Sequence, residues 1–345
     1  MNKEYVLNFA KQLLSIDSPT GYTKKAIAFL EAEARNMGYP TERTVKGNLM
    51  IHISGKCHEK TVGLSAHCDT LGLMVRSIKA DGKLALTTLG GPIIPTLDSE
   101  YCRIYTRDGR QYTGTIVCTS PAVHVYPDAA SKPREIDNME IRIDEVVKCK
   151  EDTENLGIRN GDIVAIDPKV EVTESEFIKS RFLDDKISAA ALFGVLRELK
   201  ERRITPAYDT IVMMSTYEEV GHGMSYLPKE ITELLAVDMG CIGLDLACSE
   251  QEVSICAKDR TGPYDYDFTT RLIALAEKEQ LHYAVDIYPM YGSDVSAARN
   301  GGNDIIGALI GPGVHASHGM ERTHIDGVME TMKLIYAYVT DEAKS

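Results

Sequence analysis

The chain has 345 residues, of which 43% are hydrophobic and 26% are charged. This length is enough for one large or two medium domains with a packed core. Acidic residues outnumber basic ones by 51 to 38, and the formal net charge of −13 comes without any Lys/Arg block that would follow a nucleic-acid backbone. No apolar run approaches the roughly 20 residues that span a bilayer. We therefore expect neither a nucleic-acid partner nor a membrane segment.

The N-terminal segment and the cysteines bear on the compartment. Met1 to Val6 lead directly into a helical pattern and lack the charged-then-apolar layout of a secretory signal. The eight cysteines are scattered, with no C-x-x-C pair and no zinc-ribbon spacing, which favours reduced and mostly buried thiols. Both features predict a cytoplasmic protein.

The first 71 residues have the pattern of an α/β domain. Val6, Phe9 and Leu13 recur at helical spacing, and a second such pattern ends before Gly38. Residues 48–53 and 61–66 then read as strands, and the second is almost wholly small and apolar, as a strand covered on both faces should be.

The pattern changes between about residue 72 and residue 172. Short alternating runs are separated by turn dipeptides at Asp81-Gly82, Asp108-Gly109 and Asn160-Gly161, which predicts an all-β segment. Helical spacing returns at Lys186, followed by buried strands at 210–215 and 234–237 and a clear last helix over 325–339. An α/β domain formed by residues 1–71 and 173–345 therefore brackets a β-rich insertion at 72–172.

Acidic residues and histidines follow several of these predicted strands. His67 and Asp69 close the second strand and point the same way, because side chains alternate along a strand. Glu218-Glu219 ends a very apolar strand, where ligand clefts of α/β proteins form, and Asp238 repeats this placement. Taken singly, a histidine at a strand end is more often a structural residue, and lone acids such as Asp238 are common in α/β proteins, whereas the Glu218-Glu219 pair is less easily explained as an ordinary surface loop.

Two further segments add ligand-type residues. Asp184 and Asp185 precede a helix, where the alternative reading is an N-cap with a carboxylate in the first turn. His315, His318 and His324 lie within ten residues just before the last helix, and an incidental histidine-rich loop is the alternative there. The combination of all these residues is a mixed imidazole and carboxylate set, which predicts two divalent ions sharing one carboxylate. Zinc, cobalt or manganese suits that set better than calcium or magnesium.

The order of these motifs resembles the tetrahedral aminopeptidase and glutamyl aminopeptidase family of cocatalytic dimetal metallopeptidases, some of whose members carry an endoglucanase label. The resemblance runs nearly end to end, and its motifs are S-P-T-G at 18–21, H-C-D-T-L-G at 67–72, L-G-I-R-N-G-D at 156–162, L-D-D before a helix, E-E-V-G, V-D, G-S-D at 292–294 and S-H-x-x-E. It implies a mixed-sheet, phosphorylase/hydrolase-like α/β catalytic domain with an inserted small β-barrel that mediates dimerisation, often within a twelve-subunit tetrahedral shell.

The resemblance also implies roles for single residues. Asp184 would bridge two metal ions. His67 and Asp238 would complete the coordination of one ion, and Glu219 and His318 would complete that of the other. Asp69 would orient His67 from behind. Glu218 would be the general base, and the bond between Asp184 and Asp185 would be a cis peptide. His124 lies where the family has a Pro-Pro-His stretch and receives no role.

The late motif departs from the family pattern. Residues 314–322 lack its Arg-Tyr pair and have a shorter His-to-Glu spacing, so His315 and His324 remain alternatives to His318, which aligns best. This departure indicates a distinct branch, whose substrate preference need not follow that of other members.

The sequence thus predicts a metallo-aminopeptidase that hydrolyses N-terminal residues from peptides or small amides with two divalent ions per subunit. One alternative is a glycoside hydrolase, which needs two carboxylates and no histidine ligands. The absence of Trp and the presence of ligand-type histidines argue against it. The other alternative is a non-catalytic scaffold that keeps the fold.

Overall fold

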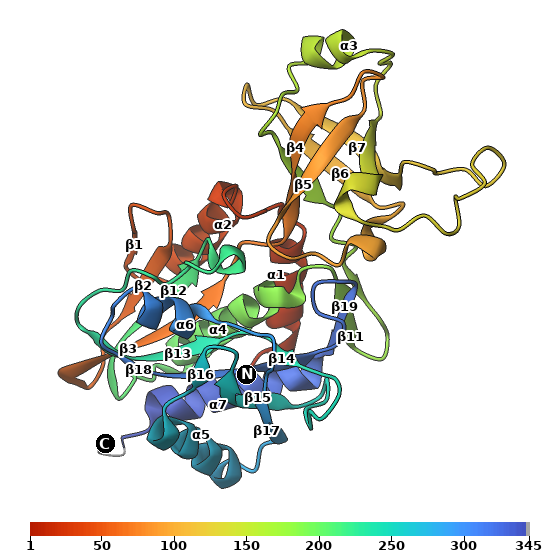
Figure 1. Ribbon diagram of the computed structural model, residues 1–345. Helices are drawn as coiled ribbons and strands as arrows, with labels where there is room; N and C mark the ends of the chain where they lie inside the picture. The colour runs from red at the N-terminus through yellow and green to blue at the C-terminus, as the bar shows by residue number, and fades with distance from the viewer. Residues whose placement is uncertain (343–345) are drawn as a thin grey trace. The chain divides into compact units, whose positions relative to one another are not determined.

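The computed structural model describes residues 1–342, and inter-residue contacts divide the chain into two compact units (Figure 1). Unit 1 comprises Met1–Asp69 and the chain from Lys169 onward, and unit 2 comprises Thr70–Pro168. Unit 2 covers nearly the same segment as the predicted insertion at 72–172. The dimerisation role of that insertion stays a prediction.

Unit 1 is built around a ten-stranded mixed sheet. Along the sheet the order is β1-β2-β12-β3-β13-β18-β15-β16, with β14 paired to β18 and β17 paired to β15. The strands are β1 (Thr41–Arg43), β2 (Leu49–Ile53), β3 (Cys57–His67), β12 (Tyr208–Ser215), β13 (Ile231–Val237), β14 (Gly240–Cys241), β15 (Val253–Asp259), β16 (Gly262–Pro263), β17 (Tyr283–Ile287) and β18 (Ile306–Val314).

Four neighbouring strands of this sheet, β12, β3, β13 and β18, run parallel to one another. Their central residues are buried, as the almost wholly apolar stretch of 61–66 predicts for a strand covered on both faces. Because parallel strands end at the same edge of a sheet, the residues that follow β12, β3 and β13 lie near one another. That edge carries the candidate site.

Helices cover the sheet. The long α4 packs on β3, α1 and α7, while α5 packs on α7 and β15, and α6 packs on β13 and β18. The helices of unit 1 are α1 (Lys3–Leu14), α2 (Lys24–Asn36), α4 (Leu183–Arg202), α5 (Tyr266–Lys278), α6 (Asp294–Asn300) and α7 (Ile325–Thr340). Within residues 1–342, no helix has both the length and the apolar character needed to cross a membrane.

A small second sheet in unit 1 holds the late histidine-rich segment. Its strands are β10 (Glu171–Val172), β11 (Phe177–Ser180) and β19 (Glu321–His324), in the order β10-β11-β19. β11 leads directly into α4, and β19 leads directly into α7. The pairing of Ser180 with Glu321 therefore brings the start of α4 beside the histidine-rich loop.

Unit 2 is a closed barrel in the order β4-β5-β8-β7-β6-β9. Its strands are β4 (Gly72–Ile78), β5 (Leu84–Leu89), β6 (Tyr101–Tyr105), β7 (Gln111–Cys118), β8 (Met139–Ile143) and β9 (Ile163–Ile166). The mixed α/β architecture with an inserted barrel is thus confirmed. The all-β description of the insertion is wrong in one respect, because α3 (Lys150–Asn155) is a helix. Its six polar residues bury only Thr153 and so leave no apolar period.

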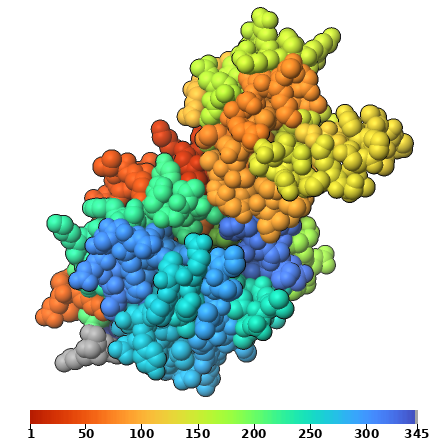
Figure 2. Space-filling view, viewed as in Figure 1, coloured from red at the N-terminus to blue at the C-terminus, as the bar shows by residue number. Residues whose placement is uncertain are grey.

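The segment between β7 and β8 stands out from the barrel, as the yellow region in Figures 1 and 2 shows. It carries the exposed side chains of Val123, Val125 and Tyr126. His124 is exposed in the same segment. This exposed position gives no indication of a role for His124.

Gly311 of β18 is needed for the close packing of the sheet beside Asp238. An added Cβ at this position would lie 1.7 Å from the Asp238 carbonyl oxygen. We expect Gly311→Ala to lower the free energy of unfolding by about 1–3 kcal/mol, because the backbone has to move apart. Chemical denaturation measures this loss. Gly243→Ala, where an added Cβ meets nothing within 4 Å, is the matched control, and equal stability of the two variants would contradict the prediction.

Candidate metal centre and active site

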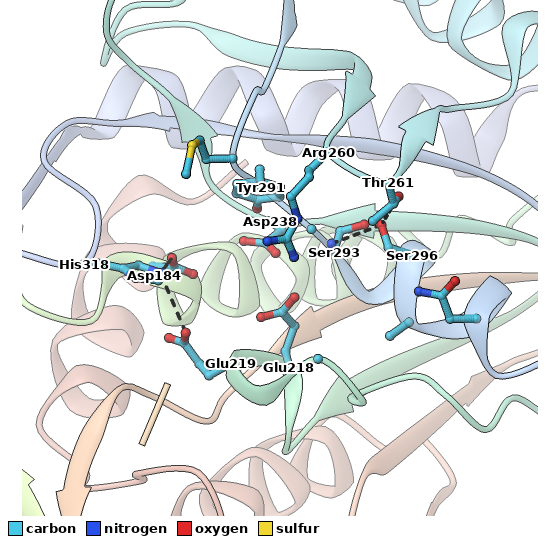
Figure 3. Close-up of a pocket in the computed structure, with 15 residues that line it drawn as sticks. Asp184, Glu218, Glu219, Asp238, Arg260, Thr261, Tyr291, Ser293, Ser296 and His318 are labelled. Carbon is cyan, nitrogen blue, oxygen red and sulfur yellow. Dashed lines mark hydrogen bonds and ion pairs between the residues drawn. The ribbon is translucent and has the colours of Figure 1, made fainter. Parts of the chain in front are cut away.

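The candidate site lies at the edge where β12, β3 and β13 end. His67 is the last residue of β3 and pairs with Ser215, the last residue of β12. Asp238 follows β13 directly, and Glu218 and Glu219 lie on a short 3-10 turn (Glu218–Val220) shortly after β12. The sequence prediction put this glutamate pair at the strand end itself, whereas the chain makes a turn first. Figure 3 shows Glu218, Glu219 and Asp238 facing a common pocket.

His67 is fixed with one ring nitrogen facing the centre of the site. Its Nδ1 lies 2.8 Å from the Asp69 carbonyl oxygen, so Nε2 is directed toward the carboxylates. Nε2 lies 2.9 Å from Asp184 Oδ1 and 3.7 Å from Glu218 Oε2. Burial lowers the pKa of His67, but Asp184, Glu218 and Asp238 outweigh this effect and raise the pKa well above its usual value.

Asp184 presents its two carboxylate oxygens to two different histidines. Oδ1 lies 2.9 Å from His67 Nε2, and Oδ2 lies 3.5 Å from His318 Nε2. Asp184 and Asp185 have non-helical backbone angles at the start of α4, and the peptide bond between them is cis. Although burial opposes it, hydrogen bonding to His318 and His67 lowers the pKa of Asp184.

Asp69 holds the glutamate pair through the main chain. Its carboxylate accepts hydrogen bonds from the backbone N–H groups of Glu218 at 3.1 Å and Glu219 at 3.3 Å, and from the Thr20 hydroxyl at 2.7 Å. It is the carbonyl oxygen of Asp69 that contacts His67, while the carboxylate lies 3.7 Å from the ring. The Asp69 side chain therefore contributes to the site differently from the support of His67 that the family resemblance implies.

The remaining carboxylates are buried and mutually repulsive. Burial, together with the neighbouring Asp184, raises the pKa of Glu219 to about 8 and that of Asp238 to about 7. The pKa of Glu218 is raised well above its usual range, mainly by burial, with further contributions from Asp238 and Asp294. Such a cluster is costly to bury without a compensating cation.

Only one of the three late histidines points to this cluster. His318 Nε2 lies 3.5 Å from Asp184 and 3.7 Å from Glu219. His315 is exposed, and its backbone pairs with Arg322. His324 is buried elsewhere, with Nε2 3.0 Å from the Ser175 carbonyl oxygen and Nδ1 accepting from the Asp326 N–H.

The residues fit a metal centre. Ligand atoms of His67, Glu218 and Asp238 lie within 4.8 Å of one another, and so do those of His67, Asp184 and Glu219. Glu219 Oε1 is buried and has no hydrogen-bond partner among the described residues. Imidazole plus carboxylate is a donor set suited to zinc, cobalt or manganese. These groups could therefore hold divalent cations.

Sequence reasoning missed a buried carboxylate that holds the late loop in place. Glu321 accepts hydrogen bonds from the Asp184 N–H at 2.9 Å and the His318 N–H at 3.0 Å. The S-H-x-x-E motif contained this residue, but the spacing alone gave it no role. Asp294 was likewise quoted only within a motif, and it is a buried acid that accepts from the Ser215 hydroxyl at 2.8 Å.

The pocket in front of the cluster has a second wall, of which the sequence motifs contained only the G-S-D segment at 292–294 and gave it no role. It is formed by the β15–β16 turn, by the loop before α6 and by α6 itself (Figure 3). Arg260, Thr261, Tyr291, Ser293 and Ser296 lie on this wall. A substrate held at the carboxylate cluster would also contact these residues.

Comparison with known proteins agrees with this geometry. The family model of the M42 glutamyl aminopeptidases matches residues 47–334. The curated relative YhfE of Bacillus subtilis (strain 168), which carries an aminopeptidase name, is 48% identical over 96% of this chain and 96% of its own length.

Solved structures share the fold. An aminopeptidase of the archaeon Desulfurococcus kamchatkensis has a TM-score of 0.87 at 23% identity, covering 98% of this chain and 95% of its own. The TET1 peptidase of Pyrococcus horikoshii, described as assembling into a tetrahedron or a large octahedral shell, has a TM-score of 0.85 at 21% identity, covering 97% and 99%. A Thermotoga maritima protein named endoglucanase is less similar, with a TM-score of 0.73 at 17% identity over 96% of each chain.

The family match covers most of the chain, and the YhfE match covers nearly all of it. The mixed α/β fold with its inserted barrel agrees with that match. The chain therefore belongs to the M42 glutamyl aminopeptidase family and is a peptide hydrolase of the aminopeptidase type.

Proposed function

We propose that this chain is a dimetal aminopeptidase in which Asp184 would be a ligand of both divalent ions. His67 and Asp238 would supply further ligands to one ion, and Glu219 and His318 would supply further ligands to the other. The observation that carries the proposal is the placement of the two Asp184 oxygens, one 2.9 Å from His67 and the other 3.5 Å from His318. A carboxylate between two imidazoles on opposite oxygens suits a bridging ligand.

Glu218 is the general base in this proposal. When bound, the ions lower the pKa of water and polarise the scissile carbonyl group. Glu218 takes a proton from the attacking water and returns it to the leaving amine. Its buried position, with Oε2 3.7 Å from His67 Nε2, and its raised pKa both suit a carboxyl group that gains and loses a proton during turnover.

Exopeptidase action follows from the groups that line the pocket. Glu218, Glu219 and Asp238 present carboxyl oxygens there, which can accept hydrogen bonds from the free amino group of an N-terminal residue. The substrates are therefore peptides or small peptide-like amides with a free amino terminus. We propose zinc as the native metal, with cobalt or manganese as substitutes, because the donor set is mixed nitrogen and oxygen.

The proposed assembly is a homo-oligomer, built from dimers through the inserted barrel and extending to a tetrahedral dodecamer. The reported assembly of the Pyrococcus horikoshii TET1 peptidase into closed shells supports this proposal. The exposed apolar side chains of Val123 and Val125 on the barrel also favour burial against another copy. A cytoplasmic location stays a prediction from the sequence.

The alternatives have less support. Glycoside hydrolysis needs two carboxyl groups and gives no catalytic role to His67 or His318. The Thermotoga maritima protein with an endoglucanase name is similar to this chain in fold alone. A non-catalytic scaffold would not need to retain a complete set of ligand-type residues around one pocket.

Changing the general base should separate metal binding from turnover. Glu218→Gln should retain both ions but lower kcat by about 10²–10⁴-fold, because it removes the proton acceptor. Asp184→Ala should lose both ions as well as activity. Metal analysis beside steady-state kinetics on aminoacyl amides measures both effects. Glu201→Gln, on the exposed end of α4, is the control. Near-normal turnover of Glu218→Gln would show that Glu218 is not the general base.

Histidine replacement should distinguish the candidates for the last ligand. His318→Gln should weaken the binding of one of the two ions by at least about tenfold, because an imidazole donor is lost. His315→Gln should bind metal as the unmodified protein does, because His315 is exposed and is not among the residues that line the pocket. Titration of zinc into the metal-free proteins measures this difference. The reverse result would transfer the role to His315.

Removal of metal should make stability depend on pH. The folded protein keeps protons on Glu219 and Asp238 up to pKa values of about 8 and 7, whereas unfolded carboxyl groups release them near about 4. The folded state therefore binds more protons between pH 4 and 8, and its free energy of unfolding falls as pH rises through that range.

The measurement is thermal unfolding of chelator-treated protein from pH 5.5 to 8, with and without added zinc. We expect the midpoint to fall by several degrees without zinc, and zinc to restore more stability at pH 8 than at pH 5.5. The double variant with Glu219→Gln and Asp238→Asn should show a shallower dependence. A midpoint of the unmodified apoprotein that rises over this range would refute the reasoning.

A further inference from the structure

The pocket beside the carboxylate cluster contains one cationic side chain. Among the described residues that line it, Arg260 is the only Lys or Arg, whereas Asp184, Glu218, Glu219 and Asp238 are acidic. The cavity has a volume of about 300 Å³, which is at the small end of the usual range for ligand pockets. Figure 3 shows Arg260 extending from the rim into this space.

The Arg260 guanidinium is unpaired. Within residues 1–342 it has no carboxylate partner within ion-pair distance, although Asp238 lines the same pocket. By contrast, Arg43 pairs with Glu31, Arg271 pairs with Glu233 and Arg322 pairs with Glu250. In a chain with 51 acidic and 38 basic residues, an unpaired arginine facing a pocket has its binding capacity free for a ligand.

The backbone that carries Arg260 is held firmly. The Arg260 N–H donates to the Tyr291 carbonyl oxygen at 3.1 Å. The neighbouring Asp259 is fully buried and accepts hydrogen bonds from the Thr261 N–H at 2.7 Å, the Tyr264 hydroxyl at 2.7 Å and the Ser296 hydroxyl at 2.8 Å. These bonds tie the β15–β16 turn to α6, so the guanidinium extends from a fixed position.

The rest of this wall is polar. Thr261, Ser293, Ser296 and Asn300 line it with hydroxyl and amide groups, and the one long aliphatic side chain, Met290, is 86% exposed at the rim. Such a wall offers little apolar surface for a leucine-type side chain. It offers a cation and neutral hydrogen-bonding groups, which together suit a carboxylate.

We propose that Arg260 is the receptor for a carboxylate of the substrate and thereby determines specificity. This inference rests on the proposed aminopeptidase function, since the ions and Glu218 act on the scissile bond nearby. The carboxylate comes from one of two sources, the side chain of an N-terminal Asp or Glu or the free C-terminus of a dipeptide. In either case the planar guanidinium binds it through paired hydrogen bonds.

The test uses the zinc-loaded full-length protein and two matched substrate pairs. The first pair is the p-nitroanilides of Glu and Gln, which differ in side-chain charge at nearly constant shape. The second pair is the dipeptide Leu-Gly and its C-terminal amide. Both pairs are measured for the unmodified protein and for Arg260→Ala, Arg260→Lys and Arg260→Glu. Arg299→Ala is the control, because Arg299 lies on α6 near the pocket but does not line it.

We expect the unmodified protein to favour the charged member of one pair in kcat/KM by at least about tenfold, and that pair identifies the source of the carboxylate. Arg260→Ala should bring the ratio close to one, Arg260→Lys should keep part of it, and Arg260→Glu should reverse it. Arg299→Ala should keep the original ratio. Loss of a charge-assisted hydrogen-bonded contact should lower kcat/KM for the charged substrate by about 10- to 100-fold.

Two outcomes would overturn the inference. One is a preference of the unmodified protein for the uncharged member of both pairs, and the other is an unchanged ratio in Arg260→Ala. If no peptide amide is cleaved at all, the proposed function fails, and calorimetric binding of glutamate against glutamine, and of Leu-Gly against its amide, still decides the role of Arg260. Equal binding within both pairs would refute it, and charge-selective binding that Arg260→Ala abolishes would support it.

Discussion

The concentration of buried negative charge at one edge of a parallel sheet is the constraint on which the site depends. Asp184, Glu218, Glu219 and Asp238 converge there, and the imidazoles of His67 and His318 lie beside them. Burial and mutual repulsion hold several of their pKa values far above the usual range. A fold that brings these groups together gains stability when a cation enters, so cation binding and integrity of the site are energetically linked.

A second set of buried carboxylates fixes the first set by accepting main-chain hydrogen bonds. Asp69 accepts from Glu218 and Glu219, Asp185 accepts from the His67 N–H at 3.1 Å, and Glu321 accepts from Asp184 and His318. Bonds to the main chain leave the side chains of the inner residues free to face the centre. The strands supply coarse placement, and these carboxylates set the positions of segments far apart in the sequence.

The sequence predicted the parts of this arrangement that depend on local pattern. The last helix over 325–339 corresponds to α7, and the position of His67 at the end of β3 follows from a stretch of small apolar residues. The helix α3 was missed, because KEDTEN has no apolar period. The choice of His318 over His315 and His324 came from a resemblance, because three histidines within ten residues cannot be told apart by local pattern. The pairing of β19 with β11 places His324 in a strand and His318 in the loop before it. Arg260 was missed because it belongs to no motif and acquires its position only when β15, β16 and α6 meet.

The two walls of the pocket suit substrate groups of opposite charge. The cluster wall binds cations and offers oxygen acceptors to the amino end of a peptide, but among the described residues it offers no Lys or Arg side chain to a substrate carboxylate. Placing an unpaired arginine on a separate wall, fixed by the buried Asp259, allows a zwitterionic or acidic substrate to bind with each charge facing its opposite. The guanidinium also has to avoid pairing with Asp238, since an ion pair there would use up both groups. The hydrogen bonds around Asp259 fix the backbone from which the Arg260 side chain extends, and within residues 1–342 this side chain forms no ion pair with Asp238.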